Sequence, residues 1–201
     1  MSLRVLIIPD KFKGTLTARA AAEAIARGWR HVRRHDEITL LPMSDGGDGF
    51  GAIIGSLLHA REQTVATVDA AHRPVRARWW WEPKSRTAVI ESANVIGLAM
   101  LPAGKFHPFK LDTWGLGKVL RVVAGKGCHQ CVIGIGGSAT NDGGFGMARA
   151  HGWQFLDNFG RPIERWVDLD QLDRLQPPPN KTPLSEMKVI VAVDVQNRLL
   201  G

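Results

Sequence analysis

The sequence is poor in cysteine and has no long apolar run. Only two of its 201 residues are cysteines, Cys128 and Cys131. A single CxxC pair, with no second pair and no C-x-x-C-H pattern, lacks the ligands of a zinc or haem site, so we expect two small residues beside a buried strand. The longest apolar run, residues 89–101, is interrupted by polar residues such as Glu91. It is well short of the roughly 20 apolar residues of a membrane span.

Targeting signals and repeats are also missing. Residues 1–4 lead directly into a strand-like run without a signal-peptide pattern, so we expect a cytoplasmic location and no membrane partner. There is no low-complexity tract, and 44% of residues are hydrophobic against 22% charged. This balance is typical of a globular protein with a sizeable core and excludes a disordered or fibrous chain.

The charge balance is basic, with 26 Lys and Arg against 19 Asp and Glu and a net charge of +7. Such a balance suits an anionic partner, either a nucleic acid or a small phosphorylated ligand. The basic residues concentrate in residues 27–35, where we expect a solvated helix end because cations oppose the negative pole of a helix. No RNA- or DNA-binding motif is present, and we expect no nucleic-acid partner.

Apolar periodicity predicts two βα units at the start of the chain. Residues 3–9 read as a buried parallel strand, and Thr17 can cap a helix whose apolar residues recur at spacings of three and four. Residues 38–41 predict a second strand, and an amphipathic helix begins at Phe50.

The next segment predicts an antiparallel hairpin of residues 64–70 and 75–81, in which alternation places Trp79 and Trp81 on one face and Trp80 on the other. Further strands are expected at 86–91, 130–135, 153–157 and 188–193, and a helix over 113–124. We therefore predict an α/β fold with largely parallel sheets, and the length of the chain allows one large domain or two small ones.

Several predicted strands end in carboxylates, lysines or glycines. In parallel α/β sheets, ligands bind at the carboxyl ends of strands, so these ends predict an active site. Lys11 and Lys13 are candidate cations, Asp10 and Asp194 candidate bases, and Asp45, Asp48 and Asp142 candidate Mg²⁺ ligands if a polyphosphate binds.

The glycine-rich segment 134–144, GIGGSATNDGG, is the richest of these strand ends. Its backbone N–H groups can hold phosphate oxygens, although no Walker A motif occurs in the chain. Gly134 to Ala139 also match a form of the dinucleotide fingerprint, with Asp157 near the expected position of a ribose-binding acid. A nicotinamide-dinucleotide protein therefore stays open as an alternative.

Taken together, the segments 9–17, 44–49, 90–93, 134–144 and 193–197 resemble the type-1 glycerate kinase family. The resemblance implies two α/β domains with the active site between them, which we expect at residues 1–90 and 91–201, the second domain being incomplete where the sequence stops at Gly201. It also implies an ATP- and Mg²⁺-dependent kinase that phosphorylates a hydroxyl of D-glycerate, usually the 2-hydroxyl. Members of the family continue well past the position equivalent to Gly201, so this sequence resembles their N-terminal portion. Gln196 and Arg198 depart from the family's Asp-Asn-Pro-Leu pattern.

On this hypothesis ATP and Mg²⁺ are the cofactors and D-glycerate is the small-molecule partner, while a homo-oligomer is left open. A non-catalytic fragment is a further alternative, one that binds nucleic acid through residues 27–34 and the tryptophans. The expected roles are catalytic for Asp194, Lys11 and Lys13; substrate-binding for Asp10, Asp45, Asp48 and Asn197; ATP-binding for Gly136, Gly137, Ser138, Ala139, Thr140 and Asn141; and metal-binding for Asp142 and Asp45.

Overall fold

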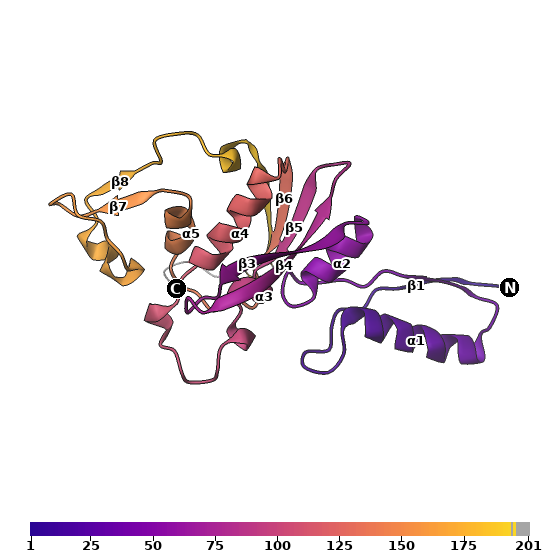
Figure 1. The fold of residues 1–201 in the computed structure, drawn as a ribbon. Coiled ribbons are helices and arrows are strands. Elements are labelled where there is room, and N and C mark those ends of the chain that lie inside the picture. Colours follow the sequence, from indigo (N-terminus) through magenta and orange to yellow (C-terminus); the bar gives the residue numbers. More distant parts are fainter. Residues whose placement is uncertain (194, 196–201) are drawn as a thin grey trace.

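A computed structural model describes residues 1–193 and 195 (Figure 1). Its strands are β1 (Arg4–Ile7), β2 (Glu37–Leu40), β3 (Arg61–Val68), β4 (Pro74–Glu82), β5 (Thr87–Glu91), β6 (Gln130–Gly134), β7 (Gln154–Leu156), β8 (Arg174–Gln176) and β9 (Lys188–Ala192). Its α-helices are α1 (Ala18–Val32), α2 (Phe50–Leu57), α3 (Ala93–Ile96), α4 (Trp114–Gly125) and α5 (Phe145–Ala150). Short 3₁₀ helices span Leu98–Met100, Pro108–Lys110, Trp166–Gln171 and Pro183–Glu186. No described helix is long and apolar enough to cross a membrane.

The first βα unit forms an arm that extends from the rest of the molecule (Figure 1). Strands β1 and β2 pair in parallel as a sheet of their own. As predicted, Thr17 caps α1, its side chain accepting a hydrogen bond from the N–H of Ala20. Ala22 and Ala26 of α1 pack on Ile7 of β1, and the basic end of the helix is exposed. The arm therefore has one apolar sheet face covered by one helix.

The main sheet has five strands in the order β3-β4-β5-β6-β9. The predicted hairpin is confirmed as β3 and β4, which pair antiparallel, and β4 pairs antiparallel with β5. Strands β5, β6 and β9 are parallel neighbours. The prediction of largely parallel sheets was therefore wrong for half of this sheet, because the hairpin occupies one side of it. The fold is mixed α/β.

Helices cover both faces of the main sheet (Figure 1). Alternation along β4 sends Trp80 to one face, where it packs with Phe50 of α2 and Val89. Trp79 goes to the other face and joins the largest core cluster with residues of α3 and α4. Trp79 and Trp80 are both buried, so they are not available to stack on bases as the nucleic-acid alternative requires. Both cysteines are buried, as predicted.

The segment after α5 forms a separate antiparallel pair, β7 with β8, at the far end of the molecule from the arm (Figure 1). The predicted boundary between residues 90 and 91 falls at the end of β5, within the main sheet. The division of the chain into two domains stays a prediction.

Candidate active site

Two glycine-containing loops meet backbone to backbone at the carboxyl ends of the parallel strands. The loop of residues 44–49, called the acidic loop below, precedes α2, and the glycine loop of residues 135–144 follows β6. The N–H of Gly136 donates to the carbonyl of Gly46 at 3.0 Å. A Cβ at Gly136 would lie 2.8 Å from Gly47 Cα, and one at Gly134 would lie 2.5 Å from the Gly46 oxygen. Glycine is required here because the two loops leave no room for side chains.

Lys11 lies at this junction. Its Nζ is 2.7 Å from Asp45 Oδ1, and a Cβ at Gly47 would lie 3.1 Å from the same Nζ. Burial is the largest influence on Lys11 and disfavours its charge, but the bond to Asp45 and the charges of Asp45, Asp10 and Asp48 outweigh it and raise the pKa of Lys11. The bonds that Asp45 accepts from Lys11 and from the N–H of Gly47 lower the pKa of Asp45. The pair is therefore ionised at neutral pH.

Several N–H groups of the glycine loop make no hydrogen bond to the residues that the structure describes. The N–H groups of Gly136 and Ala139 donate to the carbonyls of Gly46 and Ile96 and hold the loop in place. Within residues 1–193 and 195, the N–H groups of Gly137, Ser138, Thr140 and Asn141 make no such bond. Gly137 has a positive φ of 73°, and a Cβ there would lie 3.8 Å from Asp48 Oδ1. This part of the loop can accept an anion beside the acidic loop.

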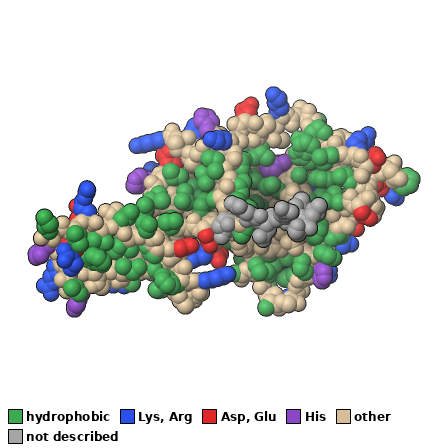
Figure 2. All heavy atoms as spheres, turned by 180° about the vertical axis from the view of Figure 1, so that it is seen from behind, with side chains coloured by type: hydrophobic (Ala, Val, Ile, Leu, Met, Phe, Trp, Pro, Cys, Tyr) green, Lys and Arg blue, Asp and Glu red, His purple; other side chains and the backbone are tan. Residues whose placement is uncertain are grey.

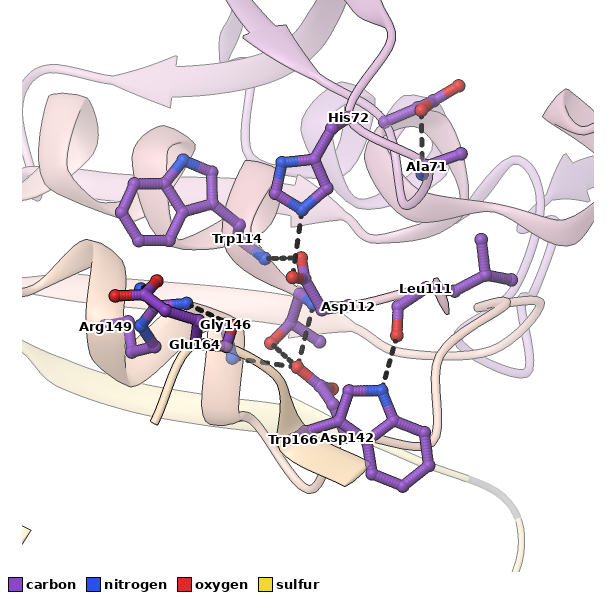
Figure 3. A network of polar contacts seen from close by, with 12 residues as sticks. Ala71, His72, Leu111, Asp112, Trp114, Asp142, Gly146, Arg149, Glu164 and Trp166 are labelled. Atoms are coloured by element: carbon purple, nitrogen blue, oxygen red, sulfur yellow. Dashed lines mark hydrogen bonds and ion pairs between the residues drawn. The ribbon is translucent and has the colours of Figure 1, made fainter. Parts of the chain in front are cut away.

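Asp142 has a different setting. Its side chain is buried, and Oδ2 accepts hydrogen bonds from the N–H and hydroxyl of Thr113 and from the N–H of Gly146, at 2.8 to 2.9 Å. Figure 3 shows this carboxylate between the segment before α4 and the first turn of α5. Asp142 thus ties the end of the glycine loop to two helices.

A cleft of about 700 Å³ lies between two walls. One wall is formed by the loop before α1 and the first turns of α1, and the other by α2. Lys11, Lys13 and Asp48 line it together with apolar side chains such as Phe12 and Ile53. This volume lies in the range of small-molecule sites. Figure 2 shows acidic side chains gathered where the arm meets the main body.

The structure thus brings together most of the predicted strand-end residues. Lys11, Asp10, Asp45 and Asp48 lie beside the start of the glycine loop, and Lys13 lines the cleft. Asp194 and Asn197 lie outside the described residues, although β9, which precedes them, passes beside Gly46. Within the described residues, no group of three or more His, Cys, Asp or Glu side chains is arranged to hold a metal ion by itself.

The dinucleotide alternative is wrong in two respects. Such a fingerprint requires a helix that begins at the glycines, but α5 begins only at Phe145. It also requires an acid at the end of the next strand of the same parallel sheet, whereas β7 belongs to the separate pair with β8. The carboxylate of Asp157 is already bonded to the N–H groups of Phe159 and Arg161 and to the Arg161 side chain.

The sequence analysis gave no role to Glu91 and Ser92, which the structure places in contact with the start of α2 and with the glycine loop. Glu91 is buried at the end of β5 and accepts a hydrogen bond from the N–H of Gly51 at 2.9 Å. Ser92 is fully buried, and its hydroxyl is 2.7 Å from that of Ser138. The available signal was the position of a charged residue directly after the apolar run 88–90, which matches the other strand ends.

The fold and these loops define a mixed α/β protein with a glycine loop at a strand end beside a lysine–aspartate pair. The model of the glycerate kinase family matches residues 5–201, and the chain belongs to this family.

Individual relatives agree. The chain is 38% identical over 200 residues to the glycerate kinase of Bacillus subtilis and 37% over 198 residues to that of Halalkalibacterium halodurans, matches that cover 99% and 98% of this chain and 52% of each relative. It is 32% identical over 200 residues to the glycerate 2-kinase of Escherichia coli, covering 99% of this chain and 52% of that protein. The crystal structure of a putative glycerate kinase 2 from Salmonella typhimurium superimposes with a TM-score of 0.83 at 32% identity, covering 99% of this chain and 54% of that one. The chain thus spans about half the length of the relatives it matches.

Proposed function

We propose that this protein is an ATP-dependent glycerate kinase that phosphorylates the 2-hydroxyl of D-glycerate. The observation that carries the proposal is the contact of the glycine loop with the acidic loop, whose Asp45 pairs with Lys11. Within the described residues, the glycine loop there has N–H groups without a hydrogen bond. Phosphoryl transfer depends mainly on positioning and on stabilising charge on the phosphoryl oxygens, and this junction supplies N–H donors and a cation for both.

The ATP phosphates are assigned to the segment 136–141. The N–H groups of Gly137, Ser138, Thr140 and Asn141 donate to phosphate oxygens, while Gly136 and Ala139 hold the loop through their bonds to Gly46 and Ile96. Lys11 stabilises charge on the transferred group. Lys13, which also lines the cleft, is assigned to the glycerate carboxylate, since a small hydroxy acid requires a positive site.

The donor set fits Mg²⁺, which prefers one or two carboxylates completed by water and phosphate oxygens. Asp45 accepts its bonds from Lys11 and Gly47 at Oδ1, which leaves Oδ2 for a ligand. Exposed Asp48 is the second carboxylate, and Asp142, whose oxygens already accept protein hydrogen bonds, acts through water. A metal ion held by these carboxylates would supply positive charge to the phosphates.

The remaining roles follow from position. Asp10 lies next to Lys11 and helps to hold its charge. Asp194 is assigned to orient the acceptor hydroxyl and Asn197 to contact the substrate, because they follow the strand that passes beside the acidic loop. A cytoplasmic location is part of the same proposal.

Phosphorus NMR of the chain with MgATP and D-glycerate tests the proposal, with a thermal melt of the same sample. We expect a 2-phosphoglycerate resonance, and turnover reduced about 100-fold in Lys11→Met because one preorganised charge is removed from the transferred group. Lys84→Met, in an exposed turn between β4 and β5, is the matched control and should keep full turnover. A cooperative melt without any phosphoglycerate would contradict the proposal for this chain.

A further inference from the structure

Glu91 and Ser92 are consecutive residues at the end of β5. Glu91 is bonded to the first turn of α2, directly after the acidic loop, and Ser92 is bonded to the glycine loop. Glu91 is the last residue of β5 and pairs in register with Gly134 of β6. Both residues therefore belong to a strand end that is buried in the centre of the main sheet. Because this strand end is rigid, the spacing between the two side chains sets the spacing between the segments to which they are bonded.

Glu91 holds the acidic loop. Its Oε2 accepts from the N–H of Gly51 in the first turn of α2, and Gly49, the residue that caps this helix, offers no side chain for the purpose. A buried carboxylate at the positive end of a helix is favoured by the helix dipole. Because α2 follows directly on the acidic loop, the bond fixes the positions of Asp45 and Asp48 in that loop.

Ser92 holds the glycine loop. Its N–H donates to the carbonyl of Gly134 at 2.9 Å. Ser138 donates its own hydroxyl proton to the carbonyl of Ile135, so the Ser92 hydroxyl is the donor in the bond to Ser138. Further along, the N–H of Leu98 donates to the carbonyl of Gly137. The segment after β5 thus fixes the part of the loop whose N–H groups are unused.

We propose that Glu91 and Ser92 are a pair of positioning residues that set the separation between the acidic loop and the glycine loop. The pair touches neither phosphate nor metal in this assignment and acts through Gly51 and Ser138. Its importance for turnover rests on the proposed function; its control of loop geometry does not.

Hydrogen exchange of the 201-residue chain tests this, with the hydrogen-bonded amides of 46–51 and, in the segment 136–139, those of Gly136 and Ala139 followed separately from the rest. We expect Glu91→Ala to speed exchange about tenfold in both segments, because a buried bond to a charged acceptor is lost and the loops share the Gly46–Gly136 contact. Ser92→Ala should act on the same two segments. Glu91→Asp, whose shorter side chain cannot reach Gly51, should act in the same direction and serves if Glu91→Ala does not fold.

Thr67→Val is the matched control. Thr67 is buried and donates to the carbonyl of Gly115, and within the described residues neither of the two is bonded to the segments 46–51 and 136–139. Its loss should lower stability without a selective change in the two segments. Faster exchange in only one segment, or a uniform rise like that of Thr67→Val, would overturn the positioning role.

A kinetic readout separates this proposal from the proposed function. If the wild-type chain turns over, Glu91→Asp should lower kcat about tenfold with the KM for ATP nearly unchanged, because the acidic loop is displaced more than the phosphate contacts. Ser92→Ala should raise the KM for ATP. If the wild-type chain melts cooperatively and forms no phosphoglycerate but the two segments respond together, the kinase proposal fails and the positioning proposal stands.

Discussion

At the scale of single residues, Asp142 shows how hydrogen bonding limits what a carboxylate can do. The motif alone makes it a natural metal ligand, but the fold surrounds it with donors from Thr113 and Gly146. Replacing Asp142 by Ala leaves these buried donors without an acceptor. We expect the free energy of unfolding to fall by about 3 kcal/mol, measured by urea denaturation.

Asp48→Ala is the control for that measurement, because Asp48 is exposed beside the same loop. Its effect on stability should stay within about 0.5 kcal/mol. If Asp142→Ala were as mild as Asp48→Ala, the bonds to Thr113 and Gly146 would contribute nothing and a purely ligand-binding role would regain support.

At the scale of elements, a histidine links the β3–β4 hairpin to the segment before α4. His72 Nε2 is 2.9 Å from Asp112 Oδ2, and Asp112 Oδ1 accepts from the N–H of Trp114 (Figure 3). The bond to Asp112 raises the pKa of His72 above 6.5, with help from the charge of Asp69, while partial burial and Arg149 oppose it.

This raised pKa has a defined consequence for stability. Protonated His72 stabilises the folded state, fully below its unfolded pKa of about 6.5, and the contribution is lost as the pH rises through the folded value. We therefore expect the free energy of unfolding of the wild type to be lower at about pH 8.5 than at about pH 6. This decrease should exceed that of His72→Gln by at most about 1 kcal/mol, because His72 is half exposed and solvent weakens its ion pair. An NMR titration should show the pKa of His72 falling in Asp112→Asn; an unchanged titration would contradict the assignment. His31→Gln, at the exposed end of α1, is the control.

Local sequence patterns predicted the individual helices and strands well, but they predicted the order of the strands in the sheets poorly. The cap at Thr17, the hairpin and the strands before the glycine loop all follow from residues close in sequence. The order of strands depends on pairings between distant segments, such as β6 with β9, and alternation carries no information on these. The contacts of Asp142 with Thr113 and of Glu91 with Gly51 are equally long-range. The motifs therefore indicated candidate residues but not the contacts that these residues make.

At the scale of the whole molecule, the arm and the main sheet both leave apolar strands exposed. Helix α1 covers only one face of the β1–β2 sheet, and Leu6 and Ile8 are about half exposed. At the edge of the main sheet, Val189, Ile190 and Val191 of β9 are also exposed. An exposed apolar edge strand promotes pairing with another chain.

We therefore expect the 201-residue chain to associate as its concentration rises, measured by size-exclusion chromatography with light scattering. Val189→Lys combined with Val191→Lys places two charges along β9 and should weaken association at least several-fold, because charged side chains block edge pairing. Val122→Lys is the matched control, since Val122 is exposed to a similar degree on α4 but belongs to no sheet edge. Association that survives the β9 substitutions and disappears on Leu6→Lys would place the contact on the arm instead; a chain that stays monomeric throughout would contradict the expectation for both surfaces.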